Sequence, residues 1–279
     1  MGIALLFVQV FLAAALLGTS PVRADGEMPL ALDIQRVKER GTLLVSMYQR
    51  DNPPFYSMDA RGQMSGFDVE IVRSFARRLG VRPVFIRTGA TFDAVVDMVA
   101  RGEADIAISK ISRTFPRAMR VAYTKPYLKL RQALLVNRLQ LAQISDGGEP
   151  EQAIRTLHGR VGVLAGSSYE QFAHQKFPHA EIVGYPDWPS LVQAVTKGDV
   201  TAAFRDEVEI KKIIKAQPEI LFMLRTVVLT DTVDPIAIAV NPDDTTLLTL
   251  LNLHLDDLAI TLSVDQILDG RLPLMDGAF

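Results

Sequence analysis

The sequence predicts an α/β protein made of two similar lobes. Short apolar segments with the length of strands alternate with amphipathic segments with the length of helices, a pattern typical of parallel sheets connected by crossover helices. In addition, TFDAVVDMVARGEADIAIS (91–109) matches PSLVQAVTKGDVTAAFRDE (189–207) in pattern. Each copy is an amphipathic helix, a glycine, an acidic residue and a strand of small residues. One copy in each half of the chain indicates paired lobes.

The first half of the chain follows this alternation closely. Strands are predicted at 43–47, 83–87, 104–109 and 132–137. A helix is predicted at 66–80, where residues such as Val72 and Phe75 recur at helical spacing before a glycine. A second helix is predicted at 91–102, with Thr91 as its N-cap.

The second half repeats the alternation after the polar segment 138–153, which we expect to be a loop. Strands are predicted at 160–165, 181–185 and 200–204, and helices at 169–177 and 189–198.

Composition excludes several functional classes. The chain of 279 residues is 48% hydrophobic and 22% charged, which is ordinary for a globular protein. A formal net charge of −2 excludes a strongly basic nucleic-acid binder. With no cysteine, there is no disulfide, thiolate ligand or cysteine nucleophile. The 4 histidines are scattered without metal-ligand spacing, so neither a metal nor a cofactor is expected.

The N-terminal 24 residues are expected to be a signal peptide. An apolar run from Ile3 to Leu17 is followed by Val22-Arg23-Ala24, which fits cleavage before Asp25. The run is shorter than the ~20 residues that a membrane span needs, and no cysteine follows it to carry a lipid. We therefore expect a soluble, secreted, periplasmic protein.

The two repeated units end in polar residues. Open α/β sheets bind ligands beyond the carboxyl ends of their strands. That point is Ser-Lys-Ile-Ser at 109–112 in the first unit and Arg205-Asp206 in the second. If the lobes face each other, hydroxyls and a carboxylate meet across a cleft, where Asp206 holds a cationic group of a ligand. The alternative is that Asp206 only caps the following helix.

Four motifs in order carry a resemblance to a known family. They are NPPFYSMDARGQMSGFDVEIVRSFARRLG (52–80), SKISRTFPR (109–117), GVLAGSSYEQF (162–172) and TAAFRDEV (201–208). With them the chain resembles the periplasmic solute-binding proteins of polar amino-acid ABC importers, family 3, from about residue 37 to about residue 260.

The resemblance implies the type II periplasmic binding protein fold, two Rossmann-like lobes joined by a two-strand hinge that closes around ligand. It implies a discontinuous first lobe of 25–135 plus 235–279 and a second lobe of 136–234. A C-terminal helix from about Asp243 to Leu262 would pack on the first lobe. The tail 263–279 departs from the family's usual ending and receives no role.

The resemblance also implies which residues bind an amino acid. Arg117 would hold the carboxylate, and a guanidinium can offer two parallel N–H bonds to it. Ser112 would add a hydroxyl, and the turn with Ser167 and Ser168 would add donors at a helix N-terminus. Asp206 would accept the ammonium. The alternative for Arg117 is a surface arginine on a short helix.

The resemblance places a second group of residues near the ligand's side chain. These are Gln49, Asn52, Phe55, Phe92 and Lys110. Gln49 replaces the acid of relatives that bind basic amino acids, which argues against lysine, arginine or ornithine. Asn52 replaces an aromatic ring. Lys110 replaces a small residue. It either enters the cleft and favours an acidic or carbonyl-bearing ligand, or it points away or pairs with Asp206 in the empty state.

Three functions follow from the resemblance. The first is a monomeric, non-enzymatic binding protein that delivers a small polar solute, expected to be an amino acid, to a membrane ABC permease. The second is a periplasmic sensory protein that presents its closed form to a receptor. The third is a dehydratase-type enzyme on the same fold, which needs a general acid, although no acid–base pair stands out in the sequence.

Overall fold

The computed structural model describes residues 28–145, 148 and 150–271. The predicted signal peptide, 1–24, lies outside these ranges. No helix within them is long and apolar enough to cross a membrane. Residues from Ala31 onward form one compact unit, and that unit is described below.

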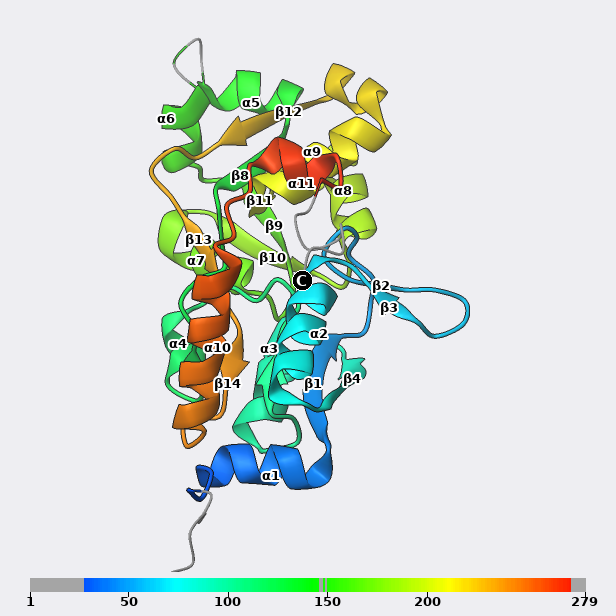
Figure 1. Cartoon of the computed structure of the whole chain (residues 1–279). Helices are drawn as coiled ribbons and strands as arrows, with labels where there is room; N and C mark the ends of the chain where they lie inside the picture. Colours follow the sequence, from blue (N-terminus) through cyan, green and yellow to red (C-terminus); the bar gives the residue numbers. More distant parts are fainter. Residues whose placement is uncertain (1–27, 146–147, 149, 272–279) are drawn as a thin grey trace, which may run out of the picture. The chain divides into compact units, whose positions relative to one another are not determined.

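The first lobe contains a five-stranded sheet with the order β4-β1-β5-β14-β6. Its strands and helices are α1 (Leu32–Arg40), β1 (Thr42–Tyr48), α2 (Phe67–Leu79), β4 (Arg82–Gly89), α3 (Phe92–Ala100), β5 (Ile106–Ala107), α4 (Phe115–Ala118), β6 (Ala122–Tyr123), β14 (Ala239–Val240) and α10 (Thr245–Leu258). A small hairpin, β2 (Ser57–Met58) with β3 (Met64–Ser65), extends from this lobe (Figure 1).

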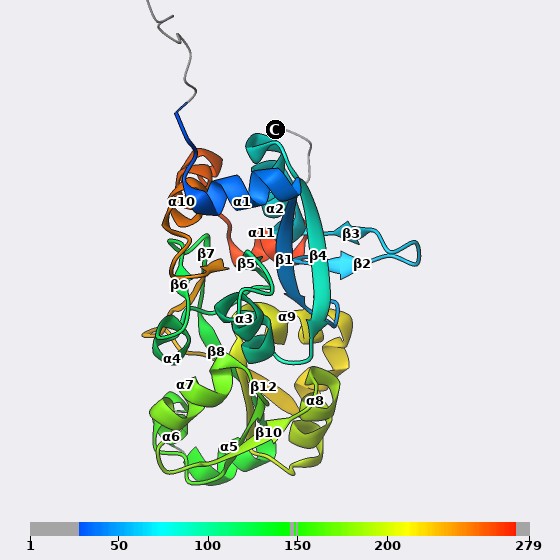
Figure 2. The ribbon, with the colours of Figure 1, turned by 90° about the horizontal axis from the view of Figure 1, so that it is seen from below.

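Helices cover both faces of this sheet. Side chains of β1 alternate between the faces: Val45 lies in a core with residues of α1, α2 and α10, whereas Leu44 contacts the α3 side. Strands β1 and β4 run parallel and side by side (Figure 2). Thr91 Oγ1 accepts a hydrogen bond of 3.1 Å from the backbone N–H of Ala94, which confirms the predicted cap of α3.

The second lobe contains another five-stranded sheet, with the order β10-β9-β11-β8-β12. Its elements are β8 (Gln132–Asn137), α5 (Arg138–Ser145), α6 (Pro150–Arg155), β9 (Arg160–Leu164), α7 (Ser168–Lys176), β10 (Glu181–Tyr185), α8 (Trp188–Lys197), β11 (Ala202–Asp206), α9 (Glu207–Ala216), the 3-10 helix η1 (Pro218–Phe222) and β12 (Leu224–Val228). Side chains of β8 alternate between two cores, one against α7 and one against α8 and α9. The prediction of two α/β lobes is confirmed.

Two segments connect the lobes as an antiparallel pair, β7 (Leu128–Leu130) with β13 (Asp234–Ile236). The chain continues from them into β8 and β14, which each run antiparallel to their neighbours. The expected parallel pairs are present between β1, β4 and β5 and between β9, β10 and β11, but β8 and β14 make both sheets mixed. Strand β8 starts at the edge where β11 ends, so that Gln132 pairs with Asp206. A strand that enters a sheet from this edge has to run in the opposite direction.

Two segments contain helices that were not predicted, the expected loop 138–153 and the tail 263–279. Residues 138–145 form α5, because the side chain of Asn137 accepts hydrogen bonds from the N–H groups of Leu139 and Gln140 and caps the helix. In the tail, Val264–Leu268 forms α11 behind a capping box at Ser263.

Candidate ligand-binding site

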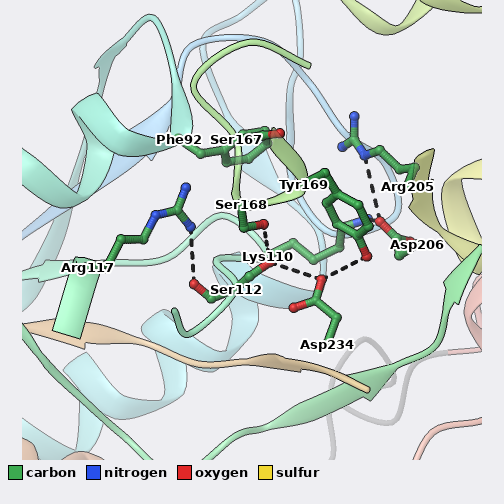
Figure 3. Close-up of a pocket in the computed structure, with 10 residues that line it drawn as sticks. All are labelled: Phe92, Lys110, Ser112, Arg117, Ser167, Ser168, Tyr169, Arg205, Asp206 and Asp234. Atoms are coloured by element: carbon green, nitrogen blue, oxygen red, sulfur yellow. Dashed lines mark hydrogen bonds and ion pairs between the residues drawn. The ribbon is translucent and has the colours of Figure 1, made fainter. Parts of the chain in front are cut away.

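Two adjoining cavities lie where the strand ends of the two sheets meet. The first cavity has a volume of about 20 Å³, enough for about one water molecule. Its lining residues are Phe92, Lys110, Ser112, Arg117, Ser167, Ser168, Tyr169, Arg205, Asp206 and Asp234 (Figure 3). The second cavity has a volume of about 360 Å³. Its lining residues are Tyr48, Arg50, Asp51, Asn52, Pro53, Tyr56, Phe92, Leu164, Asp187, Trp188, Pro189, Arg205, Glu209, Lys212 and Ile213.

Arg117 presents a buried guanidinium to the first cavity from the short helix α4. Its Nε donates to Asp93 at 2.8 Å, and its Nη1 donates to the carbonyl oxygen of Ser112 at 3.1 Å. Its Nη2 is buried and has no hydrogen-bond partner among the described residues. Only 3% of Arg117 is exposed, so this arginine is not a surface residue. It is held in place and keeps the Nη2 amino group, with two N–H donors, free for an anion.

A chain of hydroxyl groups crosses the first cavity from one lobe to the other (Figure 3). Ser168 Oγ at the start of α7 donates to Ser112 Oγ at 2.8 Å, and Ser112 Oγ donates to Asp234 Oδ2 at 3.0 Å. The hydroxyl of Tyr169 donates to the same oxygen at 3.0 Å. Burial, followed by the nearby charge of Asp206, raises the pKa of Asp234 to about 6.

Lys110 bridges the two lobes. Its ammonium lies 2.9 Å from Asp206 Oδ2 and 2.6 Å from Glu209 Oε1, and all three side chains are buried. The ammonium also lies 4.9 Å from the centre of the Phe55 ring. Lys110 therefore pairs with Asp206, as one of the two alternatives had it, and it also lines the first cavity.

Asp68 holds the backbone of Lys110 by a hydrogen bond. Lys110 has a left-handed φ of 52°, which is uncommon for a residue with a side chain. Its N–H donates to Asp68 Oδ2 at 2.7 Å, and the hydroxyl of Tyr127 donates to Asp68 Oδ1 at 2.9 Å. Burial raises the pKa of Asp68 to about 7. These contacts direct the Lys110 side chain towards the second lobe.

Asn52 belongs to the same network. Its amide donates to Glu209 Oε1 at 3.0 Å, and its carbonyl accepts from Lys212 at 2.6 Å. Burial alone would raise the pKa of Glu209, but the charges of Lys110, Lys212 and Arg205 together lower it. The carboxylate of Glu209, which lines the second cavity, therefore remains ionised.

Phe92 and Arg205 line both cavities, and further aromatic rings line the second. Phe92 stacks on Tyr48 with 4.6 Å between ring centres. The guanidinium of Arg205 lies 6.0 Å from the Phe92 ring and 5.4 Å from the Trp188 ring. Buried polar atoms of two rings, Tyr56 OH and Trp188 Nε1, have no partner among the described residues.

Three expected site residues either do not line the cavities or have their hydrogen-bonding group already used. Gln49 is exposed and lines neither cavity. Phe55 is fully buried and contacts Lys110 rather than either cavity. Ser167 lines the first cavity, but its hydroxyl donates to the carbonyl oxygen of Leu164 at 2.7 Å. The N–H groups of Gly166 and Ser167, expected as ligand donors, donate to Glu170 and Leu164.

Sequence reasoning missed several lining residues. Examples are Tyr169, Glu209, Lys212 and Asp234, whereas Arg205 was named at the end of its strand but without a role. Glu209 and Lys212 were open to prediction, since Glu209 lies three positions after Asp206 and Lys212 lies three positions after Glu209, a spacing that makes each consecutive pair neighbours on a helix. Within the described residues, no cluster of three or more His, Asp or Glu side chains could hold a metal ion.

Comparison with known proteins identifies relatives along most of the chain. Residues 44–270 match the model of the bacterial extracellular solute-binding proteins, family 3. The histidine-binding periplasmic protein of Salmonella typhimurium is 30% identical over 168 residues, which are 59% of this chain and 61% of that protein. The L-cystine-binding protein TcyJ of Escherichia coli is 26% identical over 204 residues, which are 73% of this chain and 72% of that protein. The match to the first of these covers less than two thirds of the relative's length.

Solved structures share the fold. An ancestral amino-acid-binding protein, described as a precursor of cyclohexadienyl dehydratase, superposes with a TM-score of 0.65 and 25% identity over 85% of this chain and 97% of that one. An amino-acid ABC transporter substrate-binding protein of Streptococcus pneumoniae bound to L-arginine superposes with a TM-score of 0.67 and 24% identity over 84% of this chain and 96% of that one.

Proposed function

Because the chain belongs to the bacterial extracellular solute-binding proteins of family 3, we propose that it binds a small polar solute between its lobes and delivers it to the permease of an ABC transporter. Its place is the periplasm, reached by a signal peptide at 1–24, and it acts as a monomer. Amino acids are the first ligand class to test, because relatives are named for histidine and cystine.

The observation that carries this proposal is the buried, half-satisfied guanidinium of Arg117. A buried N–H group without a partner costs free energy, and a ligand carboxylate would remove that cost. Nη2 of Arg117 and the hydroxyls of Ser112 and Ser168 line one cavity. Charge-assisted hydrogen bonds contribute about 1.5–3 kcal/mol each, and a micromolar ligand needs about 8 kcal/mol in total.

The contacts between the lobes support closure around the ligand. Besides Lys110, the pairs Ser168–Ser112 and Arg50–Asp187 connect residues of opposite lobes, and β7 and β13 form the hinge between them. The lobes, expected at 25–135 plus 235–279 and at 136–234, would separate to admit the solute and close on it. Strand β8 puts the start of the second lobe at Gln132. In the closed arrangement the first cavity is too small for an amino acid, so ligand entry needs this motion.

We propose a binding protein rather than an enzyme. A structural neighbour is described as the precursor of a dehydratase, and Asp234, with its raised pKa of about 6, is the residue that could donate a proton. Its Oδ2 already accepts two hydrogen bonds, and no base is paired with it in the first cavity. Incubation with prephenate tests this alternative, since product formation would establish it.

The experiment for the proposed function is a thermal-shift screen of the purified protein against amino acids, dicarboxylates and prephenate. A ligand at 100 times its dissociation constant adds about 2.7 kcal/mol to the unfolding free energy, which is an easily measured shift. A hit that calorimetry confirms with a stoichiometry of one supports capture of a small solute. If no carboxylate or amino acid shifts the transition, the proposal is wrong.

A further inference from the structure

The charges of the cleft define a narrower ligand class. Building on the proposed function, we propose that the cleft selects small carboxylates without an amino group, such as 2-oxo acids, over the matching amino acids, because Lys110 already occupies the carboxylates that an ammonium would need. Lys110 is then a residue that determines specificity by taking the place of a ligand group.

Both carboxylate oxygens of Asp206 already have partners within the chain. Its Oδ2 accepts from the Lys110 ammonium at 2.9 Å, and its Oδ1 accepts from the backbone N–H of Glu209 at 3.2 Å. Only 1% of the residue is exposed. An ammonium has donors only and needs acceptors, so at this buried carboxylate it would either lie beside the ammonium of Lys110 and be repelled by it, or displace Lys110 or the helix cap.

Glu209 is occupied in the same way. Its Oε1 accepts from Lys110 at 2.6 Å and from Asn52 at 3.0 Å, and its Oε2 accepts from Lys212 at 3.2 Å. Three cations, Lys110, Lys212 and Arg205, surround this carboxylate. A fourth positive charge at this point would meet repulsion rather than an unpaired partner.

The unused hydrogen-bonding capacity of the first cavity consists mostly of cationic donors. Arg117 Nη2 has no partner among the described residues. The Arg205 guanidinium lies against two aromatic rings, and its Nε is 3.8 Å from Asp206, beyond hydrogen-bonding distance. Both guanidinium groups line the first cavity. This arrangement favours an anion.

Asp234 Oδ1 is the one carboxyl oxygen lining the first cavity that has no partner among the described residues. Burial and the charge of Asp206 raise the pKa of this carboxyl group to about 6, so Asp234 is mainly ionised at pH 7, where it is an acceptor for an ammonium, and mainly protonated below about pH 6. A protonated Asp234 can instead donate to an anion or to a carbonyl oxygen.

Displacement of Lys110 is opposed from several directions. Its side chain is 4% exposed, its ammonium lies over the Phe55 ring, and its backbone is held by Asp68. If a ligand's ammonium replaced it at Asp206, the ammonium of Lys110 would have to stay buried with fewer partners, which is costly.

The second cavity fits the remainder of such a ligand. It adjoins the first at Phe92 and Arg205 and is walled by Tyr48 and Trp188. If Arg117 binds the first carboxylate of a ligand, the rest of the ligand would lie in the second cavity. An apolar group would contact the aromatic rings there, and a second carboxylate would lie near Lys212. Matched compounds with identical side chains isolate the contribution of the amino group.

The test is calorimetry of the purified protein with matched pairs: 2-oxoglutarate and glutamate, phenylpyruvate and phenylalanine, and 4-methyl-2-oxopentanoate and leucine. We expect at least one 2-oxo acid to bind at least ten times more tightly than its amino acid. If the amino acid of every binding pair binds as tightly or more tightly, the proposal is overturned while the proposed function survives. If neither series binds, the proposed function fails and this proposal fails with it.

A charge-neutral double variant tests the role of Lys110 directly. Lys110→Met with Glu209→Gln removes one positive and one negative charge and leaves Asp206 Oδ2 open. We expect the preference to move towards the amino acid by at least tenfold. The matched control is Lys211→Met on the solvent side of α9, where the lysine pairs with Glu207, and it should keep the wild-type preference. If the folded double variant keeps the wild-type preference, the proposal is overturned. If the double variant does not fold, the calorimetry of the wild-type protein with the matched pairs decides the proposal.

Discussion

The ammonium of Lys110 lies 2.9 Å from Oδ2 of Asp206, and this contact joins the two lobes at the ends of β5 and β11. Asp206 also accepts from the N–H of Glu209 and caps α9. The carboxylate at the end of the buried strand therefore has two partners within the chain, a helix N-terminus and a lysine from the opposite lobe. In the proposed binding mode, the preference for a ligand and the stability of the contact between the lobes depend on the same ion pair.

Replacement of Arg117 by alanine should weaken carboxylate binding by at least about 2 kcal/mol, or about thirtyfold, because the cavity loses its unpaired N–H donor. Calorimetry at a temperature where both proteins are folded measures the effect. Arg120→Ala is the control, since Arg120 is exposed and pairs with Asp97. Equal affinities of wild type and Arg117→Ala would contradict the carboxylate assignment.

Replacement of Asp206 by serine should lower the unfolding free energy by more than about 2 kcal/mol. Serine keeps an N-cap oxygen but leaves the buried ammonium of Lys110 with one carboxylate fewer, and breaking a buried pair costs about 3–5 kcal/mol. Denaturant unfolding without ligand measures this. The matched control is Asp187→Ser, because Asp187 caps α8 but pairs with a half-exposed Arg50; it should lose less than about 1 kcal/mol. Similar losses in both variants would mean that Asp206 acts only as a cap.

Local sequence chemistry was sufficient to predict the alternating elements and the cap at Thr91, because those features depend on neighbouring residues. The network around Lys110 was not predictable in this way. Lys110 and Asp206 are 96 residues apart, and two alternatives for the lysine side chain were left open. The choice between them depends on the left-handed backbone of Lys110 and on its contact with Asp68, and both are set by packing within the first lobe.

The antiparallel strands and the role of Asp234 were missed for a related reason. Hydrophobic patterning identifies a strand but not its direction. Strand β8 runs antiparallel to β11 because it enters the sheet at the edge where β11 ends. Asp234 lies on a short hinge strand with no motif around it. Its importance follows from the meeting of Ser112 and Tyr169 at one oxygen, which only the tertiary structure provides.

Replacement of Asp68 by asparagine should change how stability depends on pH. Burial raises the pKa of Asp68 to about 7, so the folded wild type retains a proton that the unfolded chain releases near pH 4. The wild type should therefore lose stability relative to the variant as pH rises from about 4 to about 7, by at most about 1.4 kcal/mol per pH unit. Above that range the difference should be constant.

Denaturant unfolding at pH 5, 6, 7 and 8 measures this difference. Asp234→Asn provides the comparison, because the pKa of Asp234 is raised only to about 6 and its difference from wild type should stop changing about one pH unit earlier. A difference between wild type and Asp68→Asn that does not vary with pH would show that Asp68 is ionised throughout.

Replacement of Gly66 by alanine should destabilise the loop that places Phe55 under Lys110. Gly66 has a φ of 117°, and a Cβ atom there would lie 2.4 Å from the carbonyl oxygen of Phe55. A backbone clash of this kind cannot be relieved by a rotamer change, so overpacking adds about 1–3 kcal/mol to a conformational cost of about 1–2 kcal/mol.

Gly62→Ala separates the two contributions, since Gly62 also has a positive φ, of 76°, but has no atom within 4 Å of the added carbon. Denaturant unfolding should show a loss of about 1 kcal/mol for Gly62→Ala and at least 1 kcal/mol more for Gly66→Ala, and equal losses would remove the close approach to Phe55 as the reason for a glycine at this position.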